Sequence, residues 1–171
     1  MALFKFFHAT KISEEDAQKE KESISRIKKA ITQKRGIDNF IDYNDCTVAF
    51  AGSKDNMELM LEIYTQKCNG KKYLYASIDD EVSWQEWDFN TVDEFENSII
   101  EYLSSRVNRT IKTVVQKEKY KSFMVSVYFL DTSINEWILI ENNKTDNKFI
   151  CRFAARKTET TEAIKTYKLE S

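Results

Sequence analysis

The sequence predicts an α+β fold, with a mostly antiparallel sheet of about six to eight strands and two main helices. Two segments place apolar residues at helical spacing, and the others alternate apolar with polar side chains or are rich in β-branched and aromatic residues. The connections between the expected strands are too short for parallel crossovers. With 171 residues, 42% of them hydrophobic, the chain is expected to form a single globular domain over residues 1–171, with a polar tail from about residue 157.

The first expected element is a helix over about residues 13–35. Ser13 offers a capping hydroxyl before three acidic residues, and Gly36 follows two basic residues as a C-terminal stop. Apolar residues recur at helical spacing along one narrow stripe, which consists of Ile24, Ile27 and Ile31. This helix should therefore lie on the surface of another element.

Three or four strands are expected next. Apolar residues alternate with Thr and Ala in residues 46–50, and Asn69-Gly70 separates two further runs as a hairpin turn would. The run 57–66 has two interpretations. A strand is favoured because it places both glutamates on one face. A helical face that Gly70 would end also fits, and it would consist of Met57, Met60, Leu61, Tyr64 and Cys68. Another strand is expected over residues 82–89.

A second helix is expected over about residues 91–105, where Thr91 and Glu94 match a capping box. Four β-branched or aromatic segments separated by polar turns then indicate a meander. These strands are placed at residues 110–117, 122–130, 136–141 and 148–153. The polar tail is considered as a helix from about Glu159.

Three scarce residue types exclude several kinds of site. Three separated glycines cannot form a Gly-rich phosphate loop, and the single histidine, His8, removes most zinc ligand sets. The three cysteines have no C-x-x-C spacing, so they indicate neither a disulfide framework nor a zinc knuckle. Cys46, Cys68 and Cys151 are expected to be reduced, buried thiols. The sequence therefore predicts no metal, no cofactor and no catalytic residue.

No targeting signal is evident in the sequence. The apolar start is short and is interrupted by Lys5, and no run approaches the roughly 20 apolar residues of a membrane span. The protein is therefore expected in the cytoplasm, without a membrane partner. The absence of proline and the abundance of Lys, Asn and Ile are associated with AT-rich genomes, such as those of low-GC bacteria and their phages.

Charge is distributed unevenly along the chain. Nine acidic residues and no Lys or Arg lie between Tyr73 and Ser105, whereas the following stretch to Lys121 is mainly basic. Acids that share a face attract basic proteins and repel nucleic-acid phosphates. Within the acidic stretch, Trp84 and Trp87 are an odd number of positions apart, so a regular strand directs them to opposite faces and leaves one exposed.

These features predict a protein-binding module, most simply an inhibitor or immunity-type protein that binds a basic toxin, nuclease or defence enzyme. An exposed indole supplies contact area at an interface, and surrounding carboxylates steer the encounter. The predicted partner-binding residues are Asp79, Asp80, Glu81, Trp84, Glu86, Trp87 and Asp88. The sequence leaves monomer and dimer open.

Two alternative functions remain open. Residues 79–81 form a carboxylate cluster at a strand end, which could bind magnesium or provide an acid and a base for an enzyme. The basic hairpin around residues 106–121 could bind nucleic acid if its charges converge. Those charges are Arg106, Arg109, Lys112, Lys117, Lys119 and Lys121. An exposed turn and a solvated strand face explain the same residues without a binding role.

Overall fold

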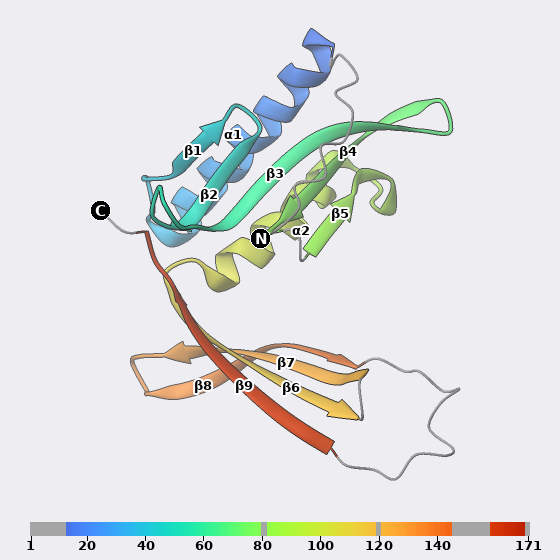
Figure 1. The fold of residues 1–171 in the computed structure, drawn as a ribbon. Coiled ribbons are helices and arrows are strands. Elements are labelled where there is room, and N and C mark those ends of the chain that lie inside the picture. The colour runs from blue at the N-terminus through green and yellow to red at the C-terminus, as the bar shows by residue number, and fades with distance from the viewer. Residues whose placement is uncertain (1–12, 80–81, 119–120, 145–157, 170–171) are drawn as a thin grey trace. The chain divides into compact units, whose positions relative to one another are not determined.

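A computed structural model describes residues 13–79, 82–118, 121–144 and 158–169 (Figure 1). The chain forms two compact units, Met1–Ser104 and Ser105–Leu169. Each unit is built on its own antiparallel sheet, of five and four strands respectively. The predicted α+β class with antiparallel pairing is confirmed, and the described residues contain nine strands in place of the expected six to eight.

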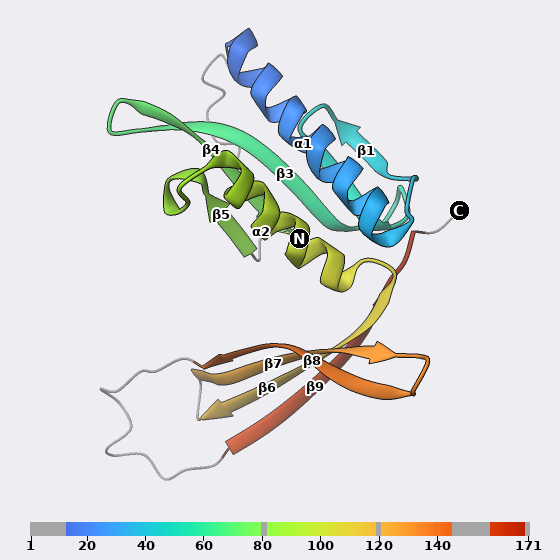
Figure 2. The ribbon, with the colours of Figure 1, turned by 180° about the vertical axis from the view of Figure 1, so that it is seen from behind.

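The first unit combines a five-stranded sheet with two helices. The strands lie in sequence order, and every neighbouring pair is antiparallel. They are β1 (Ile41–Asn44), β2 (Thr47–Gly52), β3 (Met57–Cys68), β4 (Lys71–Ile78) and β5 (Val82–Gln85), and a 3₁₀ helix, η1 (Glu86–Asp88), follows. Figure 2 shows the helices α1 (Glu14–Arg35) and α2 (Val92–Arg106) on the same face of this sheet.

The first helix begins and ends, and the second begins, where their capping residues predict. The Ser13 hydroxyl accepts the backbone N–H of Asp16, and Gly36 adopts φ 65° while its N–H donates to the Thr32 carbonyl at 2.8 Å. In α2 the Thr91 hydroxyl accepts the Glu94 N–H at 3.1 Å. The expected helices at 13–35 and 91–105 are therefore confirmed, and local hydrogen bonds cap both ends of α1 and the start of α2.

The run 57–66 is a strand, as favoured, and belongs to a long hairpin. Asn69 and Gly70 both have positive φ, 51° and 83°, as a two-residue turn that matches the twist of its strands requires. In β3, Leu61 and Ile63 are buried beneath the helices, whereas Glu62 and Tyr64 are exposed on the opposite face. The hairpin therefore presents a polar and aromatic outer face.

The structure differs from the expected elements at residues 82–89 and in the polar tail. The strand expected over 82–89 ends at Gln85, because the Glu86 carboxylate accepts the Leu74 N–H at 2.8 Å and the chain turns into η1. The helix considered from Glu159 is wrong, since the Thr-rich segment Thr158–Tyr167 forms strand β9. The strand expected at 148–153 lies outside the described residues.

The second unit is a four-stranded antiparallel sheet in the order β8-β7-β6-β9. Its strands are β6 (Arg109–Glu118), β7 (Lys121–Asp131), β8 (Glu136–Lys144) and β9. Residues 110–117, 122–130 and 136–141 are thus strands, as predicted. β9 pairs with the whole length of β6, from Arg109 opposite Tyr167 to Glu118 opposite Thr158.

The core of the first unit lies between its sheet and its two helices. The large side chains that are fully buried there are Ile27, Ile31, Phe50, Leu61, Ile63, Ile78, Phe95, Ile99 and Leu103. The isoleucine stripe of α1 thus faces the sheet, as its helical spacing predicts. Neither helix of the described ranges combines the length and apolar composition that a membrane crossing requires.

Candidate functional site

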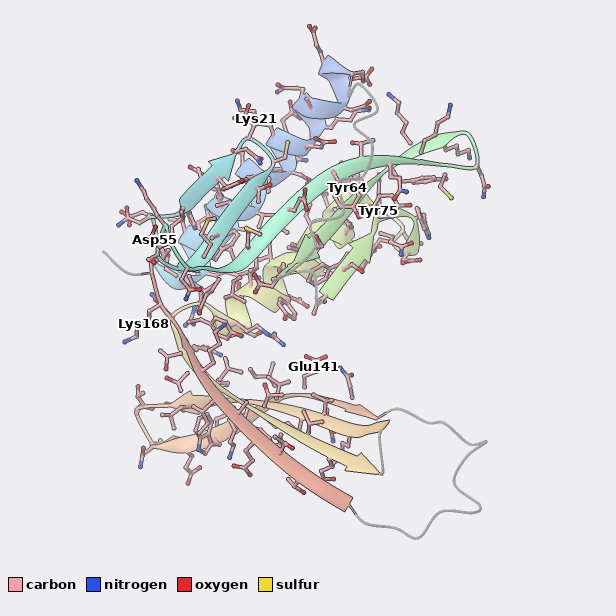
Figure 3. The ribbon with its side chains drawn as sticks, in the orientation of Figure 1. Lys21, Asp55, Tyr64, Tyr75, Glu141 and Lys168 are labelled. Atoms are coloured by element: carbon pink, nitrogen blue, oxygen red, sulfur yellow. The ribbon has the colours of Figure 1, made fainter. Side chains whose placement is uncertain are left out.

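Four aromatic side chains gather on the outer face of the five-stranded sheet, opposite the helices. Tyr64 and Tyr75 are cross-strand partners whose rings stack, with centroids 5.4 Å apart and planes at 9° (Figure 3). Trp87 folds back from η1 and meets Tyr73 and Tyr75 edge-to-face, at centroid distances of 5.1 and 5.0 Å. We call Tyr64, Tyr73, Tyr75 and Trp87 the outer aromatic cluster.

The outer aromatic cluster is both fixed and accessible. Tyr64 is 38% exposed and Trp87 is 40% exposed, while Tyr73 and Tyr75 are half-buried between them. Since both tyrosines already hold the indole in place, a partner that packs on it immobilises little side-chain motion. This combination distinguishes Trp87 from Tyr43, a 67% exposed residue of the edge strand β1.

Trp84 lies on the other face of the sheet and has a different role. It is paired with Ala76 of β4, its indole N–H donates to the Ser98 hydroxyl at 3.0 Å, and its ring meets Tyr102 edge-to-face. Trp84 therefore stabilises the packing of α2 against the sheet. The two tryptophans lie on opposite faces, as the sequence predicts, and the more exposed one is Trp87.

The predicted acidic residues divide between structural and surface positions. The Asp79 carboxylate accepts the backbone N–H groups of Leu59 and Met60 at 3.0 and 2.8 Å. Asp79 thereby stabilises an irregular point of β3, where Leu59 is buried with φ 49°. The Glu86 carboxylate accepts the backbone N–H of Leu74 in β4, and Asp88, next to Trp87 in sequence, is exposed.

Of the seven predicted partner-binding residues, the adjacent Trp87 and Asp88 are both exposed, and Glu86, which precedes them, is half-buried. Asp79 and Trp84 are held by contacts within the first unit. Asp80 and Glu81 lie outside the described residues.

Sequence analysis did not identify the three tyrosines of the cluster. The signal is present, because a two-residue turn at 69–70 pairs residues whose numbers sum to 139, and Tyr64 then faces Tyr75. The same register places the exposed Glu62 on the outer face, two residues from Tyr64. Trp87 could not be added in this way, because it reaches the cluster through η1.

A hydrogen-bonded ion pair between the half-exposed Arg26 and the buried Glu96 joins the two helices. Glu96 of α2 is buried, and its carboxylate accepts Arg26 Nε at 2.9 Å, Arg26 Nη2 at 2.8 Å and the hydroxyl of the buried Ser23. This hydrogen bond to Glu96 raises the pKa of Arg26, against the opposing effect of burial. Glu96, although it belongs to the acidic stretch 73–105, thus stabilises the packing of α1 against α2.

Three cations of the basic hairpin, Arg106, Arg109 and Lys112, make contacts within the second unit. Arg106 is buried and pairs with Glu141 at 3.2 Å, and the Arg109 guanidinium lies 4.0 Å from the ring centroid of Phe129. Lys112 lies over two rings, those of Tyr128 and Trp137, at 5.2 and 4.7 Å. These contacts are packing interactions, and they do not gather the three charges at one phosphate site. Lys119 lies outside the described residues.

A cleft of about 320 Å³ lies between α1, the β3–β4 hairpin, η1 and the start of α2. Acidic and basic side chains alternate in its lining, and several pair with one another or with neighbours, as Lys72 does with Asp16 at 2.5 Å and Lys19 with Glu15 at 2.9 Å. The hydrogen bonds from Lys72 and Ser13 lower the pKa of Asp16. Within the described ranges, no three His, Cys, Asp or Glu side chains are grouped to hold a metal ion.

Cys46 and Cys68 are half-buried, which corrects the expectation of buried thiols; Cys151 lies outside the described residues. Both positions are at strand ends, where the chain leaves the core: Cys46 precedes β2 and Cys68 ends β3. The Cys46 thiol donates to the buried Glu20 at 3.2 Å, and Glu20 also accepts the Thr65 N–H at 2.6 Å. Burial and this hydrogen bond raise the pKa of Cys46 to about 12.

Native Cys46 should therefore be a slow nucleophile. At pH 8 its alkylation by iodoacetamide is expected to be more than about 100-fold slower in the folded protein than in urea, because the thiolate is the reactive form. Peptide-resolved mass spectrometry measures both rates. Because folding raises the pKa of Cys46, this thiol stabilises the folded state at pH values below about 9. The stabilisation is lost as the pH rises from about 9 toward 12. Folded and unfolded rates within tenfold of each other would contradict this assignment.

The chain matches no protein family, no curated protein and no solved structure. Residues 1–104 contain 20 acidic and 13 basic residues, a net charge of −7, whereas residues 105–169 contain 7 and 13, a net charge of +6. Glu170, outside both ranges, completes the total charge of −2. The outer aromatic cluster thus belongs to the acidic part of the chain, residues 1–104.

Proposed function

We propose that this protein is a cytoplasmic protein-binding module that receives a basic partner on the outer aromatic cluster. The observation that carries the proposal is the environment of Trp87. Its indole is 40% exposed, is held edge-on by two tyrosines, and is followed directly by the exposed Asp88. Fixed aromatic side chains of this kind are the usual anchors of protein interfaces.

Charge supports a basic partner over an acidic one or a nucleic acid. The unit that contains the cluster has a net charge of −7, and Glu62 and Asp88 are exposed on the outer face or beside Trp87. Such a field accelerates the approach of a positively charged protein and opposes that of a phosphate backbone.

An inhibitor or immunity-type role fits these properties best. A protein that neutralises a basic toxin, nuclease or defence enzyme needs a stable scaffold, a charged face for rapid association and a few aromatic anchors. The first unit has a helix-covered sheet as scaffold, and its helices leave the outer face to the aromatic cluster. No reaction is required of any side chain in this role.

The proposal predicts that Trp87→Ala weakens partner binding by at least about 30-fold, chiefly through faster dissociation. The partner is first captured from the source organism with the wild-type chain and identified by mass spectrometry, and its purified form is then used for kinetic measurements. Tyr43→Ala is the matched control, because it removes a more exposed aromatic ring from the same sheet. Unchanged binding by a folded Trp87→Ala variant would refute the proposal.

Charge reversal tests the steering separately. Asp88→Lys should slow association and flatten its dependence on salt, with a smaller effect on dissociation. Asp55→Lys is the control, since Asp55 is exposed in the turn between β2 and β3, away from the cluster (Figure 3). Equal effects of the two reversals would show that net charge alone, without the outer face, governs the encounter.

A further inference from the structure

The second unit is built on a single layer of strands. Its described elements are β6 to β9 and the last residues of α2 (Figure 1). One face of this sheet is covered, because Ile111 and Val127 are buried and the register of β6 with β7 places them on the same face. On the opposite face, which we call the open face, no apolar side chain of the described residues is buried.

A row of four side chains crosses the open face from one edge of the sheet to the other. Lys112 of β6 lies opposite Tyr128 of β7 and opposite Ile164 of β9, and Tyr128 lies opposite Leu139 of β8. The two residues at the ends of the row are exposed aliphatic side chains, Ile164 at 61% and Leu139 at 50%. Exposed apolar side chains that belong to one surface are typical of an interaction site.

The lysine in this row is compatible with an apolar contact. Its Nζ lies 4.7 Å from the ring centroid of Trp137 and 5.2 Å from that of Tyr128. Attraction to two ring faces offsets part of the cost of removing the ammonium group from water. The exposed Glu162 lies on the same face of β9, two residues from Ile164, and provides one opposite charge. The centre of the open face is thus largely apolar and balanced in charge.

We propose that the open face is a homodimer interface, on which a second copy of the chain packs its own open face. The inference goes beyond the proposed function, because the outer aromatic cluster takes no part in it. Strands of 9 to 11 residues give a four-stranded face an area of roughly 600 Å². Two such faces bury about 1,200 Å² in total, the lower limit of stable interfaces. Sheets that pack in this way form a β-sandwich.

A second copy fits the open face better than other partners do. In a two-fold symmetric contact, the exposed Leu139 and Ile164 of one copy meet the equally apolar surface of the other. A nucleic acid would find a single lysine in the row, and its ammonium group already lies over two rings. An acidic protein surface would be attracted by the +6 charge of residues 105–169, but its carboxylates would lose water against apolar side chains.

Sedimentation velocity of the full chain tests the inference. A dimer should be present at about 50 µM protein. Leu139→Glu and Ile164→Glu should each raise the dissociation constant at least about 30-fold, because the dimer would then bury an unpaired carboxylate. Both side chains are exposed in the single chain, so each variant should keep the far-UV circular dichroism of the wild type. Ile134→Glu is the matched control, since Ile134 is 56% exposed in the turn between β7 and β8.

Salt separates this dimer from association through opposite charges. About 0.5 M NaCl should preserve or tighten the open-face dimer, because it screens the repulsion between two basic units, whereas a contact between the acidic and basic units of two copies would dissociate. A wild-type chain that is monomeric at about 50 µM, or a dimer that both glutamate variants retain, would overturn the inference. So would binding of a thymidine decanucleotide that Ile164→Glu abolishes, because the open face would then be a nucleic-acid site.

Discussion

Replacing Glu96 by alanine is expected to lower the free energy of unfolding of the first unit by about 3 kcal/mol. Its carboxylate is buried and accepts three hydrogen bonds, two from Arg26 and one from Ser23. The substitution leaves the buried Ser23 hydroxyl without this acceptor and removes the ion pair that joins α1 to α2. Urea unfolding followed by tryptophan fluorescence measures the loss, because Trp84 packs against α2.

Two further variants identify the cause of that loss. Glu101→Ala is the matched control, since Glu101 is an exposed acid of the same helix and should change stability by less than about 0.5 kcal/mol. Arg26→Ala should cost at least as much as Glu96→Ala, because it leaves the buried Glu96 carboxylate without its cationic partner, whereas Arg26 is already half in contact with water. A Glu96→Ala variant as stable as wild type would show that the pair contributes nothing to the joining of the helices.

Asp79→Ala is expected to lower the free energy of unfolding by about 3 kcal/mol without a direct effect on partner binding. The variant loses two charge-assisted hydrogen bonds, to the N–H groups of Leu59 and Met60, at a point where Leu59 has positive φ. Asp79 itself has φ 50°, which alanine tolerates less well than aspartate. Thermal and urea unfolding of the variant provide the measurement.

Asp79→Asn and Asp55→Ala separate the structural role of Asp79 from a surface role. Asparagine keeps one acceptor oxygen and tolerates positive φ, so Asp79→Asn should recover about half of the loss. Asp55→Ala, at the exposed turn, should leave stability nearly unchanged. If Asp79→Ala instead weakens partner binding and leaves stability intact, Asp79 contacts the partner directly, as the sequence alone suggested.

Local signals in the sequence were sufficient for the helices and the hairpin. Ser13, Thr91 and Gly36 act through hydrogen bonds to residues within four positions, and Asn69-Gly70 fixes its turn by φ alone. β9 was missed because its partner β6 lies about 50 residues earlier in the chain, and a polar strand at a sheet edge has no apolar alternation of its own.

The candidate site was predictable only in part, because several of its contacts join residues that are far apart in sequence. Trp84 and Trp87 lie on opposite faces as predicted, but not by strand alternation, because β5 ends at Gln85 and Trp87 reaches the outer face through η1. Which of the two is more exposed depends on α2, which packs on Trp84. The role of Asp79 was hidden because its two donors lie 19 and 20 residues away. The predicted partner-binding acids therefore included both Asp79, which stabilises the sheet, and Asp88, which is exposed to solvent.

The strand order of the two sheets has a consequence for folding during protein synthesis. In the first unit every strand pairs with the one synthesised just before it, so each pairing closes a short loop and can form as the chain emerges. In the second unit β6 has β7 on one side but must wait for β9 on the other. The open edge of β6 is therefore exposed in the nascent chain, and premature termination before residue 158 is expected to yield a folded first unit attached to an aggregation-prone remainder.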